Sequence, residues 1–404
     1  MNILHLTLGF YPAVSWGGPV KIVHQNCKEL VRRGHQVSVY CTNLLDKKQK
    51  IQPGTFEKRI DGIRVVYFAT WNIPWWPGTL GPIWLPDLPG YLKREIAGYD
   101  IVHINGYRNL MALPVSRAAR RSGIPFIIQP HGAMPIIVNS FFVKRVYDWF
   151  FGAKELNGVS AVIASQESEQ QQIQAYKIPT EKIIIIPNSC DISERESFPE
   201  PGKFRQRFGI SPDHPLILFL GRINKKKGTD MLVEAFARLD GLDAILVIAG
   251  PDDGQLEEVR GLIQKYALED RVILPGLLSG PDVFSAFQDA DLFVLPCRAD
   301  TFPIAIVEAC LAGTPMVITD RCEIAHLVKD RVADVVPFDA QAFAMAMESL
   351  LTDRVRYETY KANCPMVMAD TFSLSVAVDR LENLYTQVIA EKHRESSRPF
   401  SPGI

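Results

Sequence analysis

Three groups of residues that could do chemistry each follow a short apolar run in this 404-residue chain: Gly17-Gly18, His131, and Arg222 with Lys227. Short apolar runs bounded by glycine or proline are typical of buried strands in a parallel sheet. The segments that follow such strands meet at one edge of the sheet, where ligands bind. We therefore expect each group to face a ligand.

Arg222 and Lys227 lie in a segment bounded by glycines, directly after an apolar run. Arginine offers a planar fork of donors and lysine a point charge, a combination that suits a diphosphate. A run of lysines is normally a solvated surface loop. Here its position directly after a predicted buried strand favours an anion site.

Gly17-Gly18 opens a predicted helix, and paired glycines let backbone N–H groups approach a phosphate there, although such a pair is more often only a turn. The pair is not a dinucleotide-binding fingerprint, because no Gly-x-Gly-x-x-Gly follows the strand. His131 can donate to a ligand or accept from one. A purely structural hydrogen bond by His131 is the alternative.

The stretch 298–315 places a helical pattern between two apolar runs, which predicts a β-α-β unit. Its helix is apolar almost all round, with Glu308 as the one charge. A carboxylate in a buried helix needs a hydrogen-bonding partner, which either a neighbouring cation or a ligand can supply.

The same stretch carries signals for both ends of its helix. We expect Asp300 or Thr301 to cap the N-terminus and Pro303 to lie in the first turn. Gly313 is expected to end the helix. Asp289 and Asp291, which match a metal-type Asp-x-Asp by letters only, precede a predicted strand, so we predict no metal site there.

Strand and helix patterns alternate along the chain, which predicts an α/β protein with doubly wound parallel sheets. A polar, proline-marked linker near residue 193 and the length of 404 residues favour two domains. We expect domains at 1–190 and 191–372, a helix at 373–390, and a disordered polar tail at 391–404.

The formal net charge of -1 hides an asymmetry between the two halves. Residues 1–188 carry 21 Lys and Arg against 12 Asp and Glu, whereas the rest of the chain has an acidic excess of ten. A basic first half predicts an anionic partner, with a solvated surface as the alternative. The seven cysteines are scattered, as expected for reduced thiols.

Two segments of the first half are rich in aromatic residues. Residues 71–92 hold Trp71, Trp75, Trp76 and Trp84 among prolines and are predicted to be a long irregular loop. Residues 136–151 are basic, aromatic and amphipathic. This second segment could lie on an anionic membrane surface or pack on its own domain, and the sequence leaves both open.

Taken in order, these landmarks resemble the retaining glycosyltransferases of family 4, which have the GT-B fold. The resemblance runs through essentially the whole chain, and it rests on the order and spacing of the set. The matching pieces are Gly17-Gly18, His131-Gly132, Pro187-Asn188 with Asp191, Gly221-Arg222, Lys227-Gly228, Gly276, the acidic pair Asp300 and Glu308, and the helix 373–390.

The resemblance implies two Rossmann-like domains facing a central cleft, with a nucleotide-diphosphate sugar (UDP- or GDP-linked) held mainly by the second. It implies one role for each candidate residue. Glu308 would bind the ribose, Arg222, Lys227, Gly17 and Gly18 the diphosphate, Leu277 and Leu278 the base, and His131, Asp300, Thr301 and Phe302 the sugar; catalysis would fall to Arg222, Lys227, His131 and Asp300.

The activity implied is transfer of a hexose-type sugar with retained configuration, without a metal or another cofactor. The acceptor would be a saccharide or a lipid-linked saccharide of a surface polysaccharide or glycolipid, and nucleic acid is not an expected partner. No apolar run reaches the roughly 18 residues of a membrane span, so we expect a cytoplasmic protein, either free or bound at the inner face of the plasma membrane.

The chain departs from the family pattern at two positions. The first acidic position is usually Glu and here is Asp300, and the glycine that follows in the family is replaced by Pro303, which lacks an N–H. These departures motivate one alternative, a protein that binds nucleotide sugars without catalysis. A second alternative, independent of them, is another GT-B enzyme, such as an epimerase or a phosphorylase.

Overall fold

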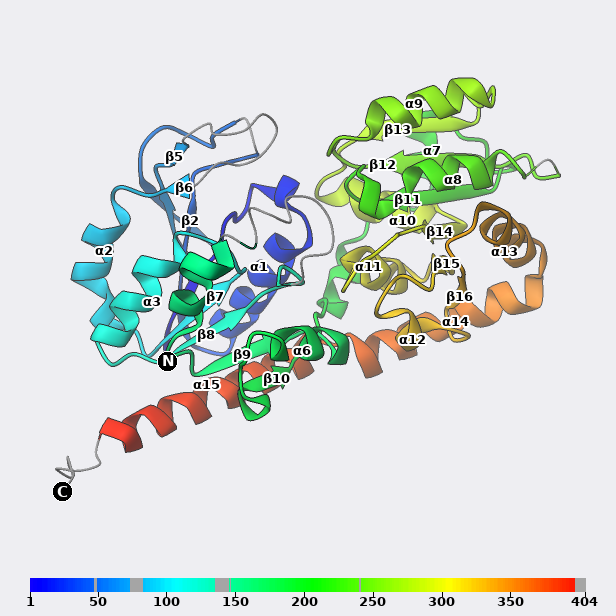
Figure 1. Ribbon diagram of the computed structural model, residues 1–404. Helices are drawn as coiled ribbons and strands as arrows, with labels where there is room; N and C mark the ends of the chain where they lie inside the picture. Colours follow the sequence, from blue (N-terminus) through cyan, green and yellow to red (C-terminus); the bar gives the residue numbers. More distant parts are fainter. Residues whose placement is uncertain (47–48, 73–82, 135–144, 146, 240, 397–404) are drawn as a thin grey trace. The chain divides into compact units, whose positions relative to one another are not determined.

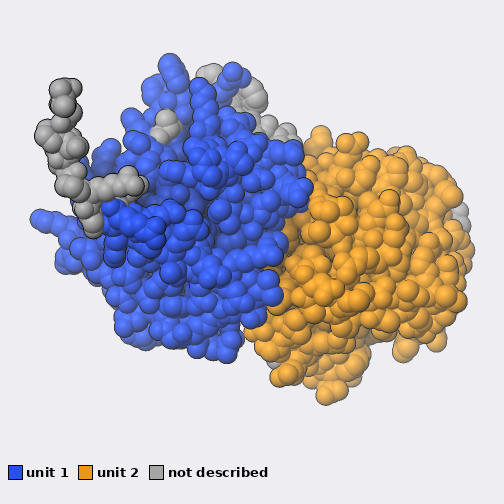
Figure 2. Space-filling model, turned by 90° about the horizontal axis from the view of Figure 1, so that it is seen from below, with its two compact units in different colours: residues 1–187, 374–404 blue, residues 188–373 orange. Residues whose placement is uncertain are grey.

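The computed structural model describes residues 1–46, 49–72, 83–134, 145, 147–239 and 241–396. The chain forms two compact units, Met1–Pro187 with Leu374–Ile404 and Asn188–Ser373 (Figures 1 and 2). Each unit is an α/β structure built on one large sheet. The two units are described in turn.

Unit 1 contains an eight-stranded sheet in the order β10-β9-β8-β7-β1-β2-β4-β3. All neighbouring strands are parallel except β3, which pairs antiparallel with β4 at one edge. Apolar runs predicted most of these strands, but not β3 and β4. The strands are β1 (Asn2–Leu6), β2 (Gln36–Thr42), β3 (Phe56–Ile60), β4 (Ile63–Phe68), β7 (Ile101–Asn105), β8 (Phe126–Gln129), β9 (Ala161–Ala164) and β10 (Ile183–Ile185).

The helices of unit 1 cover both faces of its sheet (Figure 1). One face packs against α1 and α15, and the other against the segment from α2 to α3 and against α6. Side chains alternate between the two faces along each strand, so each strand supplies both cores. The helices are α1 (Gly18–Arg32), α2 (Leu88–Glu95), α3 (Ala112–Arg121), α5 (Ala153–Leu156), α6 (Glu167–Gln174) and α15 (Leu374–Ser396).

Unit 2 contains a six-stranded, fully parallel sheet in the order β13-β12-β11-β14-β15-β16. The central strands β11, β12, β14 and β15 are mostly apolar and almost entirely buried, as expected for a sheet covered by helices on both faces, whereas the edge strands β13 and β16 are only partly buried. The strands are β11 (Leu216–Leu220), β12 (Ile245–Ala249), β13 (Val272–Gly276), β14 (Leu292–Leu295), β15 (Met316–Thr319) and β16 (Ala333–Val336). The helices are α7 (Lys203–Phe208), α8 (Thr229–Phe236), α9 (Leu256–Lys265), α10 (Pro281–Asp289), α11 (Ile304–Ala312), α12 (Ala325–Val328), α13 (Ala340–Thr352) and α14 (Arg354–Thr371).

Several sequence-based expectations change in the structure. The predicted irregular loop at 71–92 contains the short antiparallel pair β5 (Trp71–Asn72) and β6 (Ile83–Trp84) and the start of α2, while residues 73–82 lie outside the described residues. Helix α15 continues to Ser396 and so includes the first six residues of the tail expected to be disordered. Residues 397–404, and most of the amphipathic segment 136–151, also lie outside the described residues.

Helix α15 is bound to the rest of unit 1 by ion pairs with Arg33, at the end of α1. The Arg33 guanidinium donates to Glu29 at 2.8 Å, to Asp379 and Glu382 of α15, and to Ser375 at 3.1 Å. Because the Arg33 side chain is only 17% exposed, its pairing with Glu382 is largely shielded from water. These contacts hold α15 against one face of the unit 1 sheet, where its apolar side chains join the core.

The pairing predicts that Arg33→Met loosens α15. The change should cost about 1–3 kcal/mol, because it takes the guanidinium away from Asp379 and leaves Glu382 of α15 with His35 in place of two partners. Hydrogen exchange of the amides of residues 374–396 should become faster than in the unaltered protein. Arg380→Met, at an exposed position on the same helix, is the control, and equal exchange in the two variants would contradict the assigned role of Arg33.

Candidate functional site

The loop between β11 and α8 carries the predicted diphosphate residues. A 3₁₀ turn, Lys225–Lys227, is capped by the Asn224 side chain, which accepts from the Lys227 N–H at 3.2 Å. Gly228 closes the loop with φ +68, and a Cβ at this position would lie 2.0 Å from the carbonyl oxygen of Pro296. Only glycine permits this approach of the loop to the end of β14.

Lys227 and Asp300 come together in the structure although they are 73 residues apart in sequence. The Lys227 ammonium donates to the Asp300 carboxylate, and the two side chains are 17% and 18% exposed. Asp300 lies in the segment between β14 and α11, next to the β11–α8 loop. Lys227, predicted to bind the diphosphate, and Asp300, predicted to bind the sugar, therefore form one ion pair.

Two further cations lie in the same loop. Arg222 lies 3.2 Å from Asp253, which also accepts from Asn224 at 2.9 Å. Lys226 is partly buried, and desolvation lowers the pKa of its ammonium, which is near Asp300 and Arg222. The sequence analysis did not separate Lys226 from the rest of the lysine run, because letters alone do not show which lysine of the turn points inward.

Arg298 and Asp230 tie the two loops of the site together, and the sequence analysis missed both. The Arg298 guanidinium donates to the two Asp230 oxygens at 2.8 and 2.6 Å, and the Arg298 N–H donates to the Lys226 carbonyl at 2.7 Å. Paired donors of this kind fix orientation as well as distance. The sequence did offer a signal for this pair. Arg298 comes shortly after one predicted strand, and Asp230 lies in the first turn of the helix that follows another.

Helix α11 carries Glu308, which is buried with 7% of its surface exposed. The expected capping by Asp300 or Thr301 is wrong, because the N-cap is Pro303 and no side chain caps the helix. The Asp300 carboxylate is held by Lys227 instead, and the Asp300 carbonyl accepts from the Glu323 N–H at 2.9 Å. Gly313 ends the helix with φ +82, as predicted.

The remaining predicted residues of unit 2 lie at the same edge of the sheet. Leu277 and Leu278 follow β13; the Leu277 side chain is 48% exposed, whereas Leu278 is buried in the core. Phe302 packs its ring edge-on against Phe372, with centroids 6.0 Å apart. Thr301 lies beside Asp300, in the segment that leads into α11.

Asp289 and Asp291 serve a structural purpose. Asp289 accepts from the N–H groups of Gly202 and Phe204 at the start of α7, and Asp291 accepts from Arg205 and the Leu216 N–H. Carboxylates at a helix N-terminus satisfy donors that the helix leaves open.

Unit 1 carries the predicted residues Gly17, Gly18 and His131. Gly17, with φ +86, is the N-cap of α1, and Gly18 is its first residue. His131 follows β8 with φ +53, and its Nε2 lies 3.2 Å from Asn105 Oδ1. Burial lowers the pKa of the His131 imidazole to about 4, so the ring is neutral at neutral pH.

Two buried charged side chains hold the segment after His131. Glu169 accepts from the Gly132 N–H at 2.7 Å and from the Ser165 N–H at 2.7 Å. Arg108 donates to the Met134 carbonyl at 2.7 Å and pairs with Asp148 at 2.8 Å. The segment that follows His131 is therefore held by Glu169 of α6 and by Arg108, which lies after β7 and pairs with Asp148.

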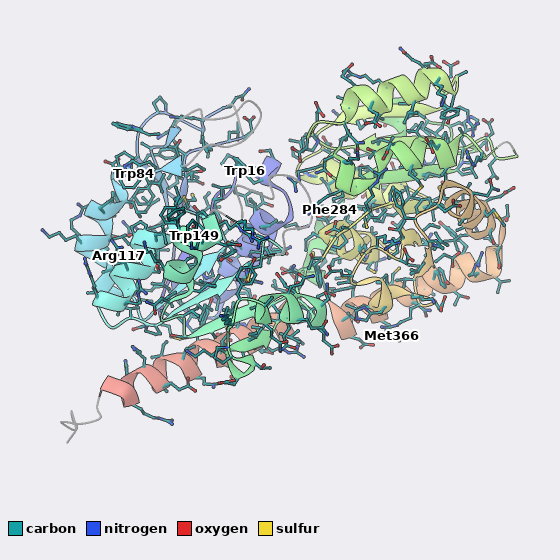
Figure 3. The ribbon with its side chains drawn as sticks, in the orientation of Figure 1. Trp16, Trp84, Arg117, Trp149, Phe284 and Met366 are labelled. Atoms are coloured by element: carbon teal, nitrogen blue, oxygen red, sulfur yellow. The ribbon has the colours of Figure 1, made fainter. Side chains whose placement is uncertain are left out.

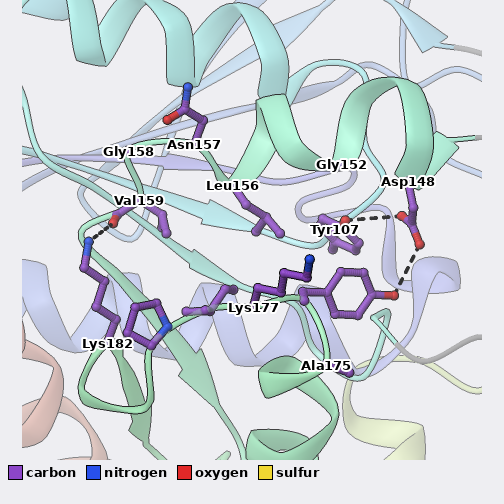
Figure 4. A pocket seen from close by; sticks show the side chains of 13 residues that line it. Tyr107, Asp148, Gly152, Leu156, Asn157, Gly158, Val159, Ala175, Lys177 and Lys182 are labelled. Carbon is purple, nitrogen blue, oxygen red and sulfur yellow. Dashed lines mark hydrogen bonds between the residues drawn. The ribbon is translucent and has the colours of Figure 1, made fainter.

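A cavity of about 610 Å³ lies beside this cluster in unit 1 (Figure 4). Tyr107 donates to Asp148 at its rim, and Lys177 and Lys182 line it from the other side. None of its lining residues is one of the predicted site residues. The cavity therefore adds no support for the predicted donor site.

The described residues contain no helix long and apolar enough to cross a bilayer.

The structure consists of two Rossmann-like units built on largely parallel sheets, which is the GT-B architecture, and a group of cations lies at the strand ends of unit 2. Residues 16–194 match the family model described as Glycosyltransferase Family 4, and residues 202–365 match Glycosyl transferases group 1. The chain belongs to this family, which confirms the predicted resemblance.

Relatives and solved structures agree with this assignment. The chain is 31% identical over 404 residues to a putative glycosyltransferase, YtcC, of Bacillus subtilis, covering 90% of this chain and 95% of the relative. It is 26% identical to the UDP-Gal:alpha-D-GlcNAc-diphosphoundecaprenol alpha-1,3-galactosyltransferase of Escherichia coli, covering 74% and 78%. The Anabaena protein HepE, solved in complex with UDP-glucose, superposes with a TM-score of 0.76 at 19% identity, covering 96% and 100%.

The cluster around Arg108 makes a prediction about pH. Glu155, on α5, is buried, and desolvation raises the pKa of its carboxyl to about 8. A raised carboxyl pKa favours the protonated form in the folded state, so this stabilisation is present below the usual pKa and is lost as pH rises towards 8.

We therefore expect Glu155→Gln to have little effect on Tm at pH 5 and to raise it by about 5 °C relative to the unaltered protein at pH 8. Thermal unfolding at both pH values measures this. Glu181→Gln, at an exposed position, is the control. A Tm difference that does not change with pH would show that Glu155 is ionised in the folded protein.

Proposed function

We propose that this glycosyltransferase moves a hexose-type sugar from a UDP- or GDP-linked donor to a saccharide or lipid-linked acceptor, with retained configuration and without a metal. The observation that carries the proposal is the group of cations in the β11–α8 loop, Arg222, Lys226 and Lys227, of which Lys227 pairs with Asp300 and Lys226 lies near it. Breaking the bond between sugar and diphosphate leaves negative charge on the nucleotide. Preorganised cations stabilise that charge as it develops.

The ion pair between Lys227 and Asp300 suggests how the donor is accommodated. A diphosphate competes with Asp300 for the Lys227 ammonium, because phosphate oxygens carry more charge than one carboxylate. Asp300, released from Lys227, can then accept from a sugar hydroxyl. We assign Glu308 to the ribose, the backbone near Leu277 and Leu278 to the base, and Gly17 and Gly18 to the diphosphate.

The names of two relatives support the proposed donor and acceptor classes. The name of the Escherichia coli relative specifies a UDP-sugar donor and an acceptor on diphosphoundecaprenol, and HepE was solved with UDP-glucose. Thermal-shift measurements with UDP-, GDP- and ADP-sugars identify the donor, because a ligand that binds the folded state raises Tm. The anomeric coupling constant of the product then tests retention.

Pro303 favours one other candidate function, because it removes a backbone donor near the proposed sugar. That candidate binds nucleotide sugars without transferring them. Donor binding with no release of nucleotide diphosphate, across a panel of acceptors, would favour it. Release that depends on an acceptor would favour transfer.

The cation cluster makes a direct mutational prediction. Lys227→Ala and Arg222→Ala should each lower kcat by roughly 10²-fold or more, because each removes charge from the departing diphosphate. Lys225→Ala is a matched control, since this lysine lies in the same 3₁₀ turn but is exposed. Unchanged turnover in both cluster variants would refute the assignment of the diphosphate site.

We further propose that unit 1 meets an anionic membrane at the cytoplasmic face. Trp149 is 79% exposed and Phe150 is 53% exposed on the single helical turn Asp148–Gly152, and the Lys154 ammonium lies 5.9 Å from the Phe151 ring centre. Arg117 is an exposed cation on α3 of the same unit (Figure 3). Exposed aromatic rings beside cations suit the interface of an anionic bilayer.

Vesicle sedimentation tests this membrane proposal. The protein should bind vesicles that contain phosphatidylglycerol, and the double variant Trp149→Ser/Phe150→Ser should bind at least about tenfold more weakly, because two apolar side chains no longer insert. The control is Met345→Ser/Met366→Ser, which changes two exposed apolar residues of unit 2. No binding by the unaltered protein would remove the membrane proposal and leave the transferase proposal intact.

A further inference from the structure

A continuous chain of polar side chains crosses the interior of unit 1 and ends at His131. Its members come from β1, β7 and α15, and each is at most 5% exposed: His5, His103, Asn105 and Tyr385. Buried polar groups in an apolar sheet are costly unless each finds a partner. The sequence analysis did not single out any of these four residues.

The sheet explains why they meet. His5 on β1 lies directly opposite His103 on β7, and their ring centroids are 4.7 Å apart. Asn105 lies two residues after His103, so both side chains point to the same face. That face is the one covered by α1 and α15, and Tyr385 of α15 reaches into it.

Hydrogen bonds link the four side chains to one another and to His131. The Tyr385 hydroxyl is 2.7 Å from His103 Nδ1 and 3.4 Å from His5 Nε2. The Asn105 amide nitrogen is 3.2 Å from His5 Nδ1, and the Asn105 oxygen is 3.2 Å from His131 Nε2. Each side chain therefore orients the next.

The orientation of the Asn105 amide is fixed by two backbone groups. Its nitrogen lies 3.3 Å from the Leu6 carbonyl and 3.4 Å from the His103 carbonyl. Carbonyl oxygens accept only, so the NH₂ group must face them and the amide oxygen must face His131. His131 Nε2 must then carry a proton in order to donate.

We propose that Asn105 is a positioning residue that holds the proton of His131 on Nε2, so that Nδ1 presents a lone pair to a hydroxyl of the donor sugar. This inference rests on the proposed function for its substrate, but not for the protonation state. In keeping with it, His131 Nδ1 has no hydrogen-bond partner among the described residues. A neutral imidazole that accepts a hydrogen bond also adds no positive charge beside a sugar that becomes positive in the transition state.

The surroundings keep His131 neutral. The titratable groups around it are His5, His103 and Tyr385 of the chain, together with Glu169 and Arg108, which bind the residues that follow it. Burial lowers the pKa of His5 to about 3 and that of His103 well below its usual value. The buried polar side chains that lead to His131 thus contribute no charge to the site at neutral pH.

The first test reads the protonation state without any substrate. The full-length protein labelled with ¹⁵N-histidine contains eight histidines, and the His131→Gln variant identifies the His131 signals by their loss. Long-range proton–nitrogen correlation spectra should show Nε2 protonated and Nδ1 unprotonated between pH 5 and 8. A proton on Nδ1 of the unaltered protein overturns the proposal.

The second test uses Asn105→Asp. A carboxylate opposite Nε2–H favours the imidazolium, so the pKa of His131 should rise. Turnover should then fall about tenfold or more as the pH is lowered through the new pKa, while the unaltered protein shows no such loss. The same pH profile in both proteins overturns the proposal.

The third test keeps the proposal falsifiable if Asn105→Asp does not fold. Tyr385→Phe removes one hydroxyl and preserves packing, and it should alter the His131 nitrogen signals and lower kcat by about two- to fivefold. Tyr360→Phe is the matched control, because it removes a buried hydroxyl bonded to Asp334 at 3.0 Å in unit 2. Unchanged His131 signals in Tyr385→Phe, or equal changes in the control, would contradict the proposal that the buried polar side chains position His131.

The spectra and the kinetics separate two failures. A protein with the expected His131 protonation state but no transferase activity refutes the proposed function and leaves the positioning role standing. A protein with transferase activity and a proton on Nδ1 refutes the positioning role alone.

Discussion

Parallel strand pairing is the constraint on which both units of this protein depend. Parallel neighbours need crossover connections, so the segment after every strand leaves from the same edge of the sheet. In unit 2 this brings the loops after β11 and β14 together, and with them Lys227 and Asp300. In unit 1 it brings the ends of β7 and β8 together, and with them Asn105 and His131.

Charge pairing then decides what each loop can do. In unit 2 the cations of the β11–α8 loop are partly matched by Asp253 and Asp300, and Arg298 locks the two loops through Asp230. These loops are therefore ordered by their own ion pairs. In unit 1 the buried rings of His5 and His103 are neutral at neutral pH, and Arg108 and Glu169 fix the backbone beside His131. One unit thus offers paired charges to an anion, and the other offers a neutral ring.

Much of the fold was predictable from local patterns. Apolar runs predicted the central strands of both sheets, and the helical pattern with Gly313 predicted α11 and its end. The edge strand β3 was missed because it is largely exposed and charged, so its residues carry no apolar run. Its neighbour β4 was missed although it is mostly apolar and buried. The capping of α11 was predicted wrongly, because Asp300 suits an N-cap by type but is held by a lysine from a distant loop.

The sequence by itself determined the class of fold and the residues at strand ends that could meet a ligand, because these follow from periodicity and from local residue types. The family followed from the resemblance of its motifs, in their order and spacing, to a known family. Only the tertiary structure decided which of those residues pair. It also revealed Arg298 with Asp230, and the chain from Tyr385 to His131. The reason is physical: an ion pair or a buried hydrogen bond depends on distance and orientation in space, and residues far apart in sequence give no local sign of either. In the sequence, these hydrogen-bonded side chains were indicated by the polar residues His5, His103 and Asn105 within apolar strands. Their partner Tyr385 lies 280 residues beyond Asn105.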